Sequence, residues 1–209
     1  MNVDVGTIRK GRKFDQVIEG ARNVFLRDGF EGASVDDIAR EAGVSKATLY
    51  SYFPDKRILF LEICKEQCLK QADAAFDLEK CDKPIDELLT VAASILVNFL
   101  ISPFSQSIHR LAVGESDRFP ELARAFYKSG PELGRERLKI LFDAGIRRGE
   151  LKIDDLDLAA DQFAALCKTD IWVRVSFHVT STPTQTEIDK IIAGTVDMFM
   201  ARYGTEYAS

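Results

Sequence analysis

The stretch from Ser34 to Lys56 constrains the fold of this chain more than any other part of its sequence. Serine commonly caps the first turn of a helix, and the stretch contains Ser34 and Ser45. Gly43 can adopt the left-handed conformation that often ends a helix. Pro54 ends the second segment, because proline has no amide hydrogen with which to continue a helix. The stretch therefore predicts two short helices that are joined by a tight turn.

The second of these helices carries the side chains that a protein needs to read DNA. Its first turn is small, polar and basic, as in the recognition helix of a helix-turn-helix. Hydroxyl and ammonium groups can bond to base edges or phosphates, and a small apolar side chain can meet a thymine methyl. A helical hairpin that merely exposes its tyrosines is the alternative interpretation. The predicted DNA-binding residues are Ser34, Ser45, Lys46, Ala47, Thr48, Tyr50, Tyr52 and Lys56.

Two runs without gaps, Phe25 to Ala39 and Gly43 to Lys56, resemble the N-terminal domain of TetR-family transcriptional regulators. Ala47 and Ser34 differ from residues that the family often has there, which affects the expected base preference. The resemblance implies an all-α fold, with an N-terminal three-helix helix-turn-helix domain and a C-terminal helical domain for effector binding and dimerisation. It also implies a homodimer, a small-molecule effector and no enzymatic activity. We place the two domains at residues 1–57 and 58–209.

A second resemblance lies further along the chain. Segments at residues 110–127, continuing through 130–131 to 148–151, and at residues 154–163 are similar to the AefR-type C-terminal domain of one TetR subgroup. This similarity supports the family but names no ligand, because effectors in that subgroup are diverse.

The distribution of charge is more informative than its sum. The net charge of −5 argues against indiscriminate nucleic-acid binding, whereas residues 1–57 carry ten cations against nine anions. Cations cluster at Arg9, Lys10, Arg12 and Lys13. This cluster predicts either an arm that lies along phosphates or in a minor groove, or a plain solvated start of a helix. The acidic remainder can orient the basic end toward DNA.

The sequence favours a soluble, cytoplasmic protein with no membrane partner. No apolar segment follows a basic start, so no signal peptide is expected. The longest nearly apolar run, Val91 to Ile101, has eleven residues and is too short to cross a bilayer.

Apolar residues at helical spacing, with glycine and proline between the runs, predict further helices. We expect the last two helices to pair with their two-fold mates in a four-helix dimer interface. The alternative is that they close the core of one subunit. The expected helices span about residues 14–28, where Asp28-Gly29 closes the first, and 58–80, 85–101, 104–116, 120–129, 131–148, 155–179 and 184–203.

An effector site is predicted among aromatic residues of the C-terminal helices. Such sites are mostly apolar cavities with a few polar anchors, for which a histidine and an aspartate are available. The alternative is that each of these residues belongs to an ordinary core or surface. The predicted effector-binding residues are Phe99, Phe104, His109, Phe126, Phe142, Phe163, Cys167, Asp170 and Trp172.

Metal, redox and catalytic chemistry are less favoured. A zinc or thiol sensor could use the cysteines and histidines, but their spacing contains no C-x-x-C pair, and buried thiols are common in cores. We expect no metal site and no cofactor, and structural disulfides are not expected in a cytoplasmic chain. The candidates are Cys64, Cys68, Cys81, Cys167, His109 and His178.

Together these patterns predict a ligand-responsive, homodimeric repressor that binds a near-palindromic double-stranded DNA operator. A helical interaction module without DNA binding would show no salt-dependent affinity for a specific duplex. A helical enzyme is the remaining alternative, but the sequence has no Gly-rich phosphate loop, G-x-S-x-G elbow or H-E-x-x-H motif.

Overall fold

The fold is that of a computed structural model, which describes residues 11–76 and 82–205. The predictions for Arg9, Lys10 and Cys81, and the expected end of the long helix near residue 80, lie outside these residues. The described part of the chain is all-α, as predicted, and contains one isolated β-bridge between Leu151 and Gly204.

The chain divides into two compact units. One unit combines Met1–Glu66 with Ser107–Phe126, and the other combines Gln67–Gln106 with Tyr127–Ser209. The division of function at residue 57 stays a prediction, because compactness alone does not separate DNA-binding residues from effector-binding residues.

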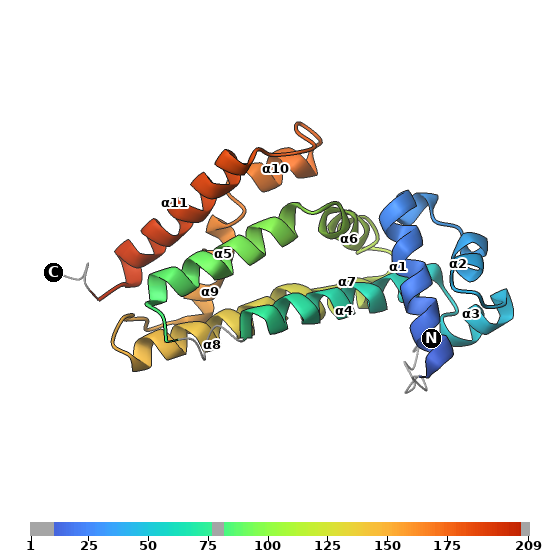
Figure 1. Ribbon diagram of the computed structural model, residues 1–209, viewed down its shortest axis with the longest axis horizontal. Helices are drawn as coiled ribbons and strands as arrows, with labels where there is room; N and C mark the ends of the chain where they lie inside the picture. The colour runs from blue at the N-terminus through green and yellow to red at the C-terminus, as the bar shows by residue number, and fades with distance from the viewer. Residues whose placement is uncertain (1–10, 77–81, 206–209) are drawn as a thin grey trace. The chain divides into compact units, whose positions relative to one another are not determined.

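The first unit is built on α1, a helix that spans Arg12–Gly32 (Figure 1). It bends at Gly29, whose φ of 71° favours glycine, close to the predicted end of the helix. The short helices α2 (Val35–Glu41) and α3 (Lys46–Tyr52) follow. The unit also contains the first part of α4 (Lys56–Phe76), the end of α6 (Pro103–Gly114) and most of α7 (Pro120–Tyr127).

Aromatic rings hold α4 against α1 in the core of this unit. The Phe60 ring centroid lies 4.8 Å from that of Phe25 and 5.0 Å from that of Phe30. Leu59 and Ile63 of α4 are also fully buried. Because such aromatic contacts add stability beyond the buried area, the first turns of α4 are firmly attached to the helix-turn-helix.

The second unit contains the central apolar helix α5 (Ile85–Ile101), whose bounds agree with the prediction. It packs against α10 (Ile171–Ser176) and α11 (Gln185–Tyr203). The paired helices α8 (Leu133–Arg147) and α9 (Leu156–Leu166) complete the unit.

Three phenylalanines from α8, α9 and α11 form the centre of this core. The Phe199 ring centroid lies 4.7 Å from that of Phe142 and 5.2 Å from that of Phe163. All three side chains are fully buried. Helices α8, α9 and α11 therefore share one apolar core within the subunit.

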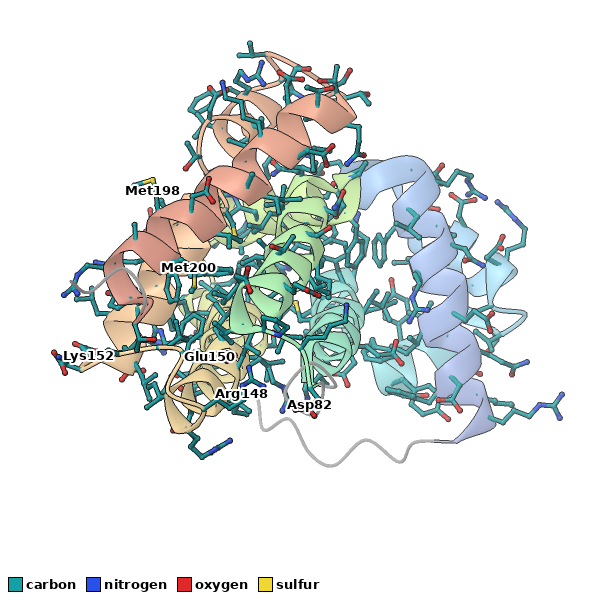
Figure 2. All side chains as sticks on the ribbon, turned by 60° about the vertical axis from the view of Figure 1, so that its left-hand side comes forward. Asp82, Arg148, Glu150, Lys152, Met198 and Met200 are labelled. Carbon is teal, nitrogen blue, oxygen red and sulfur yellow. The ribbon has the colours of Figure 1, made fainter. Side chains whose placement is uncertain are left out.

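Backbone hydrogen bonds fasten the loop after α8 to the end of α11. The amide of Lys152 donates to the carbonyl of Tyr203 at 2.8 Å, and the amide of Thr205 donates to the carbonyl of Glu150 at 3.1 Å. Figure 2 shows the charged side chains of this loop, among them Arg148, which bonds to Glu150 at 2.8 Å.

The prediction of one helix over residues 155–179 is wrong, because the chain breaks between α9 and α10. Asp170 has φ 56° and ψ −67°, and the amide of Ile171 donates to the carbonyl of Thr169 at 2.7 Å. Asp170 is therefore the centre of a γ-turn of the rare, strained hand. Neither glycine nor proline marks this turn, so helical periodicity does not indicate it.

The predicted break before Pro131 is also absent. A π-helical turn, Lys128–Glu132, joins α7 to α8 and contains this proline. Such a turn tolerates the missing amide donor without ending the helical path.

Within the described residues, no single helix has both the length and the apolar composition to span a membrane, although α5 and α6 meet these criteria as a bent pair.

Candidate nucleic-acid interface

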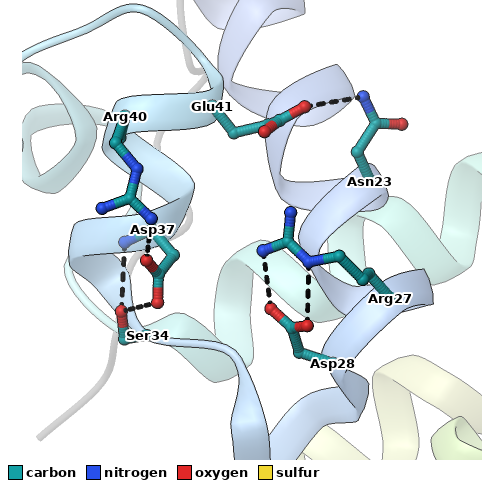
Figure 3. A network of polar contacts seen from close by, with 7 residues as sticks. All are labelled: Asn23, Arg27, Asp28, Ser34, Asp37, Arg40 and Glu41. Carbon is teal, nitrogen blue, oxygen red and sulfur yellow. Dashed lines mark hydrogen bonds and ion pairs between the residues drawn. The ribbon is translucent and has the colours of Figure 1, made fainter.

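Ser34 caps the start of α2, as predicted. Its hydroxyl oxygen accepts from the amide of Asp37 at 3.0 Å, and the hydroxyl donates to the Asp37 carboxylate at 2.5 Å (Figure 3). Bonds from Ser34 and then Arg40 lower the pKa of Asp37 below its ordinary value. The Ser34 hydroxyl is thus already used within the protein, which adds a structural role to its predicted DNA contact.

The turn after α2 is set by Gly43, which has φ 62°. The amide of Val44 donates to the carbonyl of Ala39 at 3.0 Å, and the amide of Gly43 donates to the carbonyl of Arg40 at 3.2 Å. This pair of bonds is the Schellman arrangement, which satisfies the last carbonyls of a helix. The turn therefore fixes the direction in which α3 starts.

A serine also caps α3. The Ser45 hydroxyl oxygen accepts from the amide of Thr48 at 3.1 Å and lies 2.9 Å from the Thr48 hydroxyl. Leu49 and Phe53 are fully buried and anchor the inner side of the helix. The caps and the apolar anchors together hold α3 in one orientation.

The outer side of α3 carries most of the predicted DNA-reading side chains. Lys46, Ala47 and Tyr50 are exposed, whereas Thr48 and Tyr52 are half-buried. The structure thus brings these five residues onto one short, capped helix, which can present hydrogen-bonding groups and a small apolar side chain to a groove. Their contacts with bases stay a prediction.

Two predicted DNA-binding lysines already have partners in the protein. Lys46 forms an ion pair with Asp36 of α2. Lys56 donates to the carbonyls of Phe30 at 2.8 Å and Ala33 at 3.0 Å. Lys56 therefore satisfies carbonyls at the end of α1, a role that sequence analysis missed because it depends on a contact between distant segments.

Gly20 is another residue that sequence analysis missed. A Cβ atom at this position would lie 2.6 Å from the amide nitrogen of Ala42 and 2.7 Å from its Cα. The glycine allows α1 to approach the end of α2 at backbone distance. The signal in the sequence was a glycine inside an otherwise regular helical pattern.

Arg57 anchors the first turn of α4. Its guanidinium bonds to Asp55 at 3.0 Å, lies 3.6 Å from a Glu115 oxygen and stacks 3.7 Å from the Phe119 ring centroid. The Asp55 carboxylate also accepts from the amide of Arg57 at 2.8 Å. The bonds from Arg57 lower the pKa of Asp55.

The predicted effector-binding residues are distributed over both units. His109 and Phe126 belong to the first unit and the other seven to the second. Phe142, Phe163 and Cys167 are fully buried, whereas Phe99, Phe104 and Trp172 are half-buried. Asp170 is exposed and pairs with Arg174 at 3.1 Å. Their common role in effector binding stays a prediction.

A buried polar pair, absent from that prediction, ties α6 to α10. Gln106 is 2% exposed and donates to the carbonyl of Leu100 at 2.8 Å. Its amide oxygen accepts from the Ser176 hydroxyl at 2.9 Å. Gln106 lies two residues after Phe104, and Ser176 lies four residues after Trp172, so about one turn of α10 separates Ser176 from Trp172. Both are therefore candidate polar anchors, which the hydrophobic pattern could not indicate.

The described cysteines have the environment of core residues. Burial raises the pKa of Cys68 to about 11 and that of Cys167 to about 12, so both thiols stay protonated at neutral pH. Cys64 is also buried. Among residues 11–76 and 82–205, no three His, Cys, Asp or Glu side chains gather in a group that could hold a metal ion.

Comparisons with known families match both parts of the chain. Residues 17–63 match the family described as "Bacterial regulatory proteins, tetR family". Residues 87–205 match the "AefR-like transcriptional repressor, C-terminal domain". Among curated proteins, the uncharacterized HTH-type transcriptional regulator YezE of Bacillus subtilis is 30% identical over 162 residues, covering 72% of this chain and 80% of its own.

Solved structures share the fold over almost the whole chain. A TetR-family transcriptional regulator from Mesorhizobium loti is 27% identical, with a TM-score of 0.84, and the match covers 95% of this chain and all of the other. The flavonoid-responsive regulator FrrA is 32% identical, with a TM-score of 0.67, and covers 94% of this chain and 99% of its own.

Proposed function

The chain belongs to the TetR family of transcriptional regulators, and we propose that it represses transcription as a homodimer until a small molecule releases it from its operator. Membership of this family makes the protein a helix-turn-helix DNA-binding regulator rather than an enzyme. Repression is supported by the match of residues 87–205 to a repressor C-terminal domain. We further propose that residues 1–57 read DNA in the cytoplasm and that residues 58–209 bind the effector and dimerise.

The orientation of α3 carries the proposal for DNA binding. Ser45 fixes its first turn, and the buried Leu49 and Phe53 turn its exposed side outward. A helix held in this way can enter a major groove with its first residues at the base edges. The direct test is binding of the purified protein to DNA upstream of its own coding sequence, with competitor DNA and several salt concentrations.

Substitutions on α3 separate base reading from backbone binding. We expect Thr48→Ala to change which operator variants are preferred, by about 1–3 kcal/mol at one base pair. Tyr50→Phe should instead weaken binding to all DNA sequences by a similar factor, because a contact with a phosphate does not depend on the base. Competition against a panel of single-base operator variants measures both effects. The reverse pattern would mean that the register of α3 on DNA is different.

The apolar side of α9 and α11 supports the proposed dimer. Met198 is 62% exposed and Leu158 is 51% exposed. Figure 2 shows Met198 pointing away from the core, toward which Met200 packs. A groove beside Met198 is lined by Gln162, Ala165, Leu166, Phe199, Arg202 and Tyr203. Exposed apolar side chains beside a groove suit a self-complementary interface.

The proposed effector is a small aromatic compound. FrrA, 32% identical to this chain, is a flavonoid-responsive regulator. We propose that the half-buried Phe99, Phe104 and Trp172 contact such a compound, with Gln106 and Ser176 as polar anchors. The other predicted residues of the same unit, Phe142, Phe163, Cys167 and Asp170, stay candidates for the surrounding wall. For His109 and Phe126, which belong to the first unit, a role in effector binding stays a prediction.

Trp172 is the single tryptophan of the chain and therefore reports on this site. We expect at least one flavonoid of a panel to quench the Trp172 fluorescence saturably, and more strongly than it quenches free N-acetyltryptophanamide. The same compound should release the protein from its operator at the same concentrations. Quenching no greater than that control, with the operator still bound, would contradict the aromatic effector but leave DNA binding intact.

A further inference from the structure

The part of the structure that carries the recognition helix has no overall excess of positive charge. Residues 11–57 contain eight Lys or Arg and eight Asp or Glu. Affinity for the DNA backbone depends on cations that neutralise phosphates and release counterions. The pairing and position of each cation therefore decide which of them can attract DNA.

Six of the eight cations already have acceptors inside the protein. Most of these are carboxylates that cancel the positive charge locally. The pairs are Arg22–Glu66, Arg27–Asp28, Arg40–Asp37, Lys46–Asp36, Arg57 with Asp55 and Glu115, and Lys56 with the carbonyls of Phe30 and Ala33.

The pair on the recognition helix is the most important of these. The side chains of Lys46 and Asp36 are 55% and 64% exposed, so their mutual attraction is weak. A phosphate could draw Lys46 away, but Asp36 would then face the same phosphate with a negative charge. The net electrostatic gain from Lys46 is therefore small.

Arg12 and Lys13 differ from the other six cations. Both are exposed in the first turn of α1, and in the described part of the chain neither side chain has a hydrogen bond or ion pair. Asp15, in the same turn, forms no ion pair with either of them. Positive charge at the start of a helix opposes the helix dipole, so these two residues do not help α1 to fold.

The next residue places this turn beside the recognition helix. The Phe14 ring centroid lies 5.9 Å from that of Tyr52 and 5.5 Å from that of Phe53, at the end of α3. The strands that border a major groove run past both ends of a helix lying in it. Arg12 and Lys13 are therefore close to where a bordering phosphate strand would pass.

We propose that, among the eight cations of residues 11–57, Arg12 and Lys13 supply most of the phosphate attraction in the operator complex, while the Lys46–Asp36 pair keeps the recognition helix nearly neutral. This division of labour rests on the proposed DNA binding and assigns a specificity role to Asp36. A neutral recognition helix gains little electrostatic binding energy from DNA of arbitrary sequence. Its contribution to affinity therefore depends on contacts with the bases.

The test compares the salt dependence of operator binding for three full-length variants. Arg12→Gln/Lys13→Gln removes four charges from the dimer and should reduce the slope of log affinity against log salt by about 3–4. The matched control, Arg27→Gln/Asp28→Asn, removes one ion pair of the same helix and should leave the slope unchanged. Asp36→Asn releases Lys46 and should steepen the slope and strengthen binding to competitor DNA.

Each result has one meaning. A reduced slope for the first variant, with unfolding stability equal to or above that of the unmodified protein, supports the proposal and excludes misfolding. An unchanged slope overturns it, as does an Asp36→Asn variant that binds competitor DNA no more tightly. If the unmodified protein prefers no DNA sequence over competitor, the proposed function itself fails.

Discussion

A methyl group on residue 20 would lie 2.6 Å from the amide nitrogen of Ala42, in the turn that precedes the recognition helix. Real Cβ atoms do not approach backbone atoms this closely, and a backbone segment cannot rotate away as a side chain can. Gly20 therefore sets the separation of α1 and α2.

We expect Gly20→Ala to lower the free energy of unfolding by about 1–3 kcal/mol, since overpacking outweighs the higher helix propensity of alanine. Operator affinity should fall with it, because the displaced turn leads into α3. Gly134→Ala in α8 is the control, as its Cβ would meet no atom within 4 Å. It should be neutral or stabilising by up to about 1 kcal/mol. Denaturant unfolding measures both, and equal effects would contradict the close approach.

The bonds to Glu187 make the stability of the fold depend on pH. Arg174 donates to the Glu187 carboxylate at 2.6 Å, and the amide of Thr184 donates at 2.8 Å. These bonds lower the pKa of Glu187 from 4.5 to about 2. The folded state therefore gains stability from this carboxylate above about pH 4.5, and loses it as the pH falls toward 2.

Glu187→Gln should accordingly lower the unfolding temperature at pH 7, and the difference from the unmodified protein should narrow as the pH falls to 3. Thermal unfolding followed by circular dichroism measures this difference. Glu31→Gln, at an exposed position, serves as the control. A gap that stays constant between pH 7 and pH 3 would show that the bonds to Glu187 do not stabilise its charged form.

Sequence patterns predicted the residues whose roles are local. Ser34, Ser45 and Gly43 act on backbone groups within four positions of themselves, so their side chains alone indicated the two caps and the turn. Gly20 and Lys56 act on residues more than twenty positions away. Their roles depend on how helices meet, which a single sequence does not specify.

The same limit applies to whole elements. The bounds of α5 followed from its apolar pattern between Pro84 and Pro103, because prolines delimit a helix by local chemistry. The break between α9 and α10 has no such marker. It arises at Asp170, whose strained backbone is maintained by the packing of the helices on either side.

The strain at Asp170 leads to a prediction about two substitutions. Glycine adopts a φ of 56° without strain and alanine does not, while both remove the exposed ion pair with Arg174. We expect Asp170→Gly to be more stable than Asp170→Ala by about 1 kcal/mol. Denaturant unfolding compares them directly, and an alanine variant of equal or higher stability would show that the turn is not strained.

At the scale of the whole molecule, DNA reading depends on the proposed dimer. Met198→Glu should place a charge within an apolar interface, a cost of several kcal/mol for each subunit. We expect a monomer in sedimentation velocity and loss of operator binding. The control is Asp189→Lys, which helical spacing places on the opposite face of α11 from Met198, and this variant should stay dimeric. A dimeric Met198→Glu variant would place the interface elsewhere.

In the proposed dimer, two copies of α3 read one symmetric DNA site. Selection of bound sequences from random DNA duplexes, using the purified full-length protein, tests it most directly. We expect enrichment of one near-palindromic sequence whose half-sites are separated by about 10 base pairs or a multiple of this distance, as a two-fold dimer requires. Selection of no sequence above background, or of a single half-site without symmetry, would contradict it.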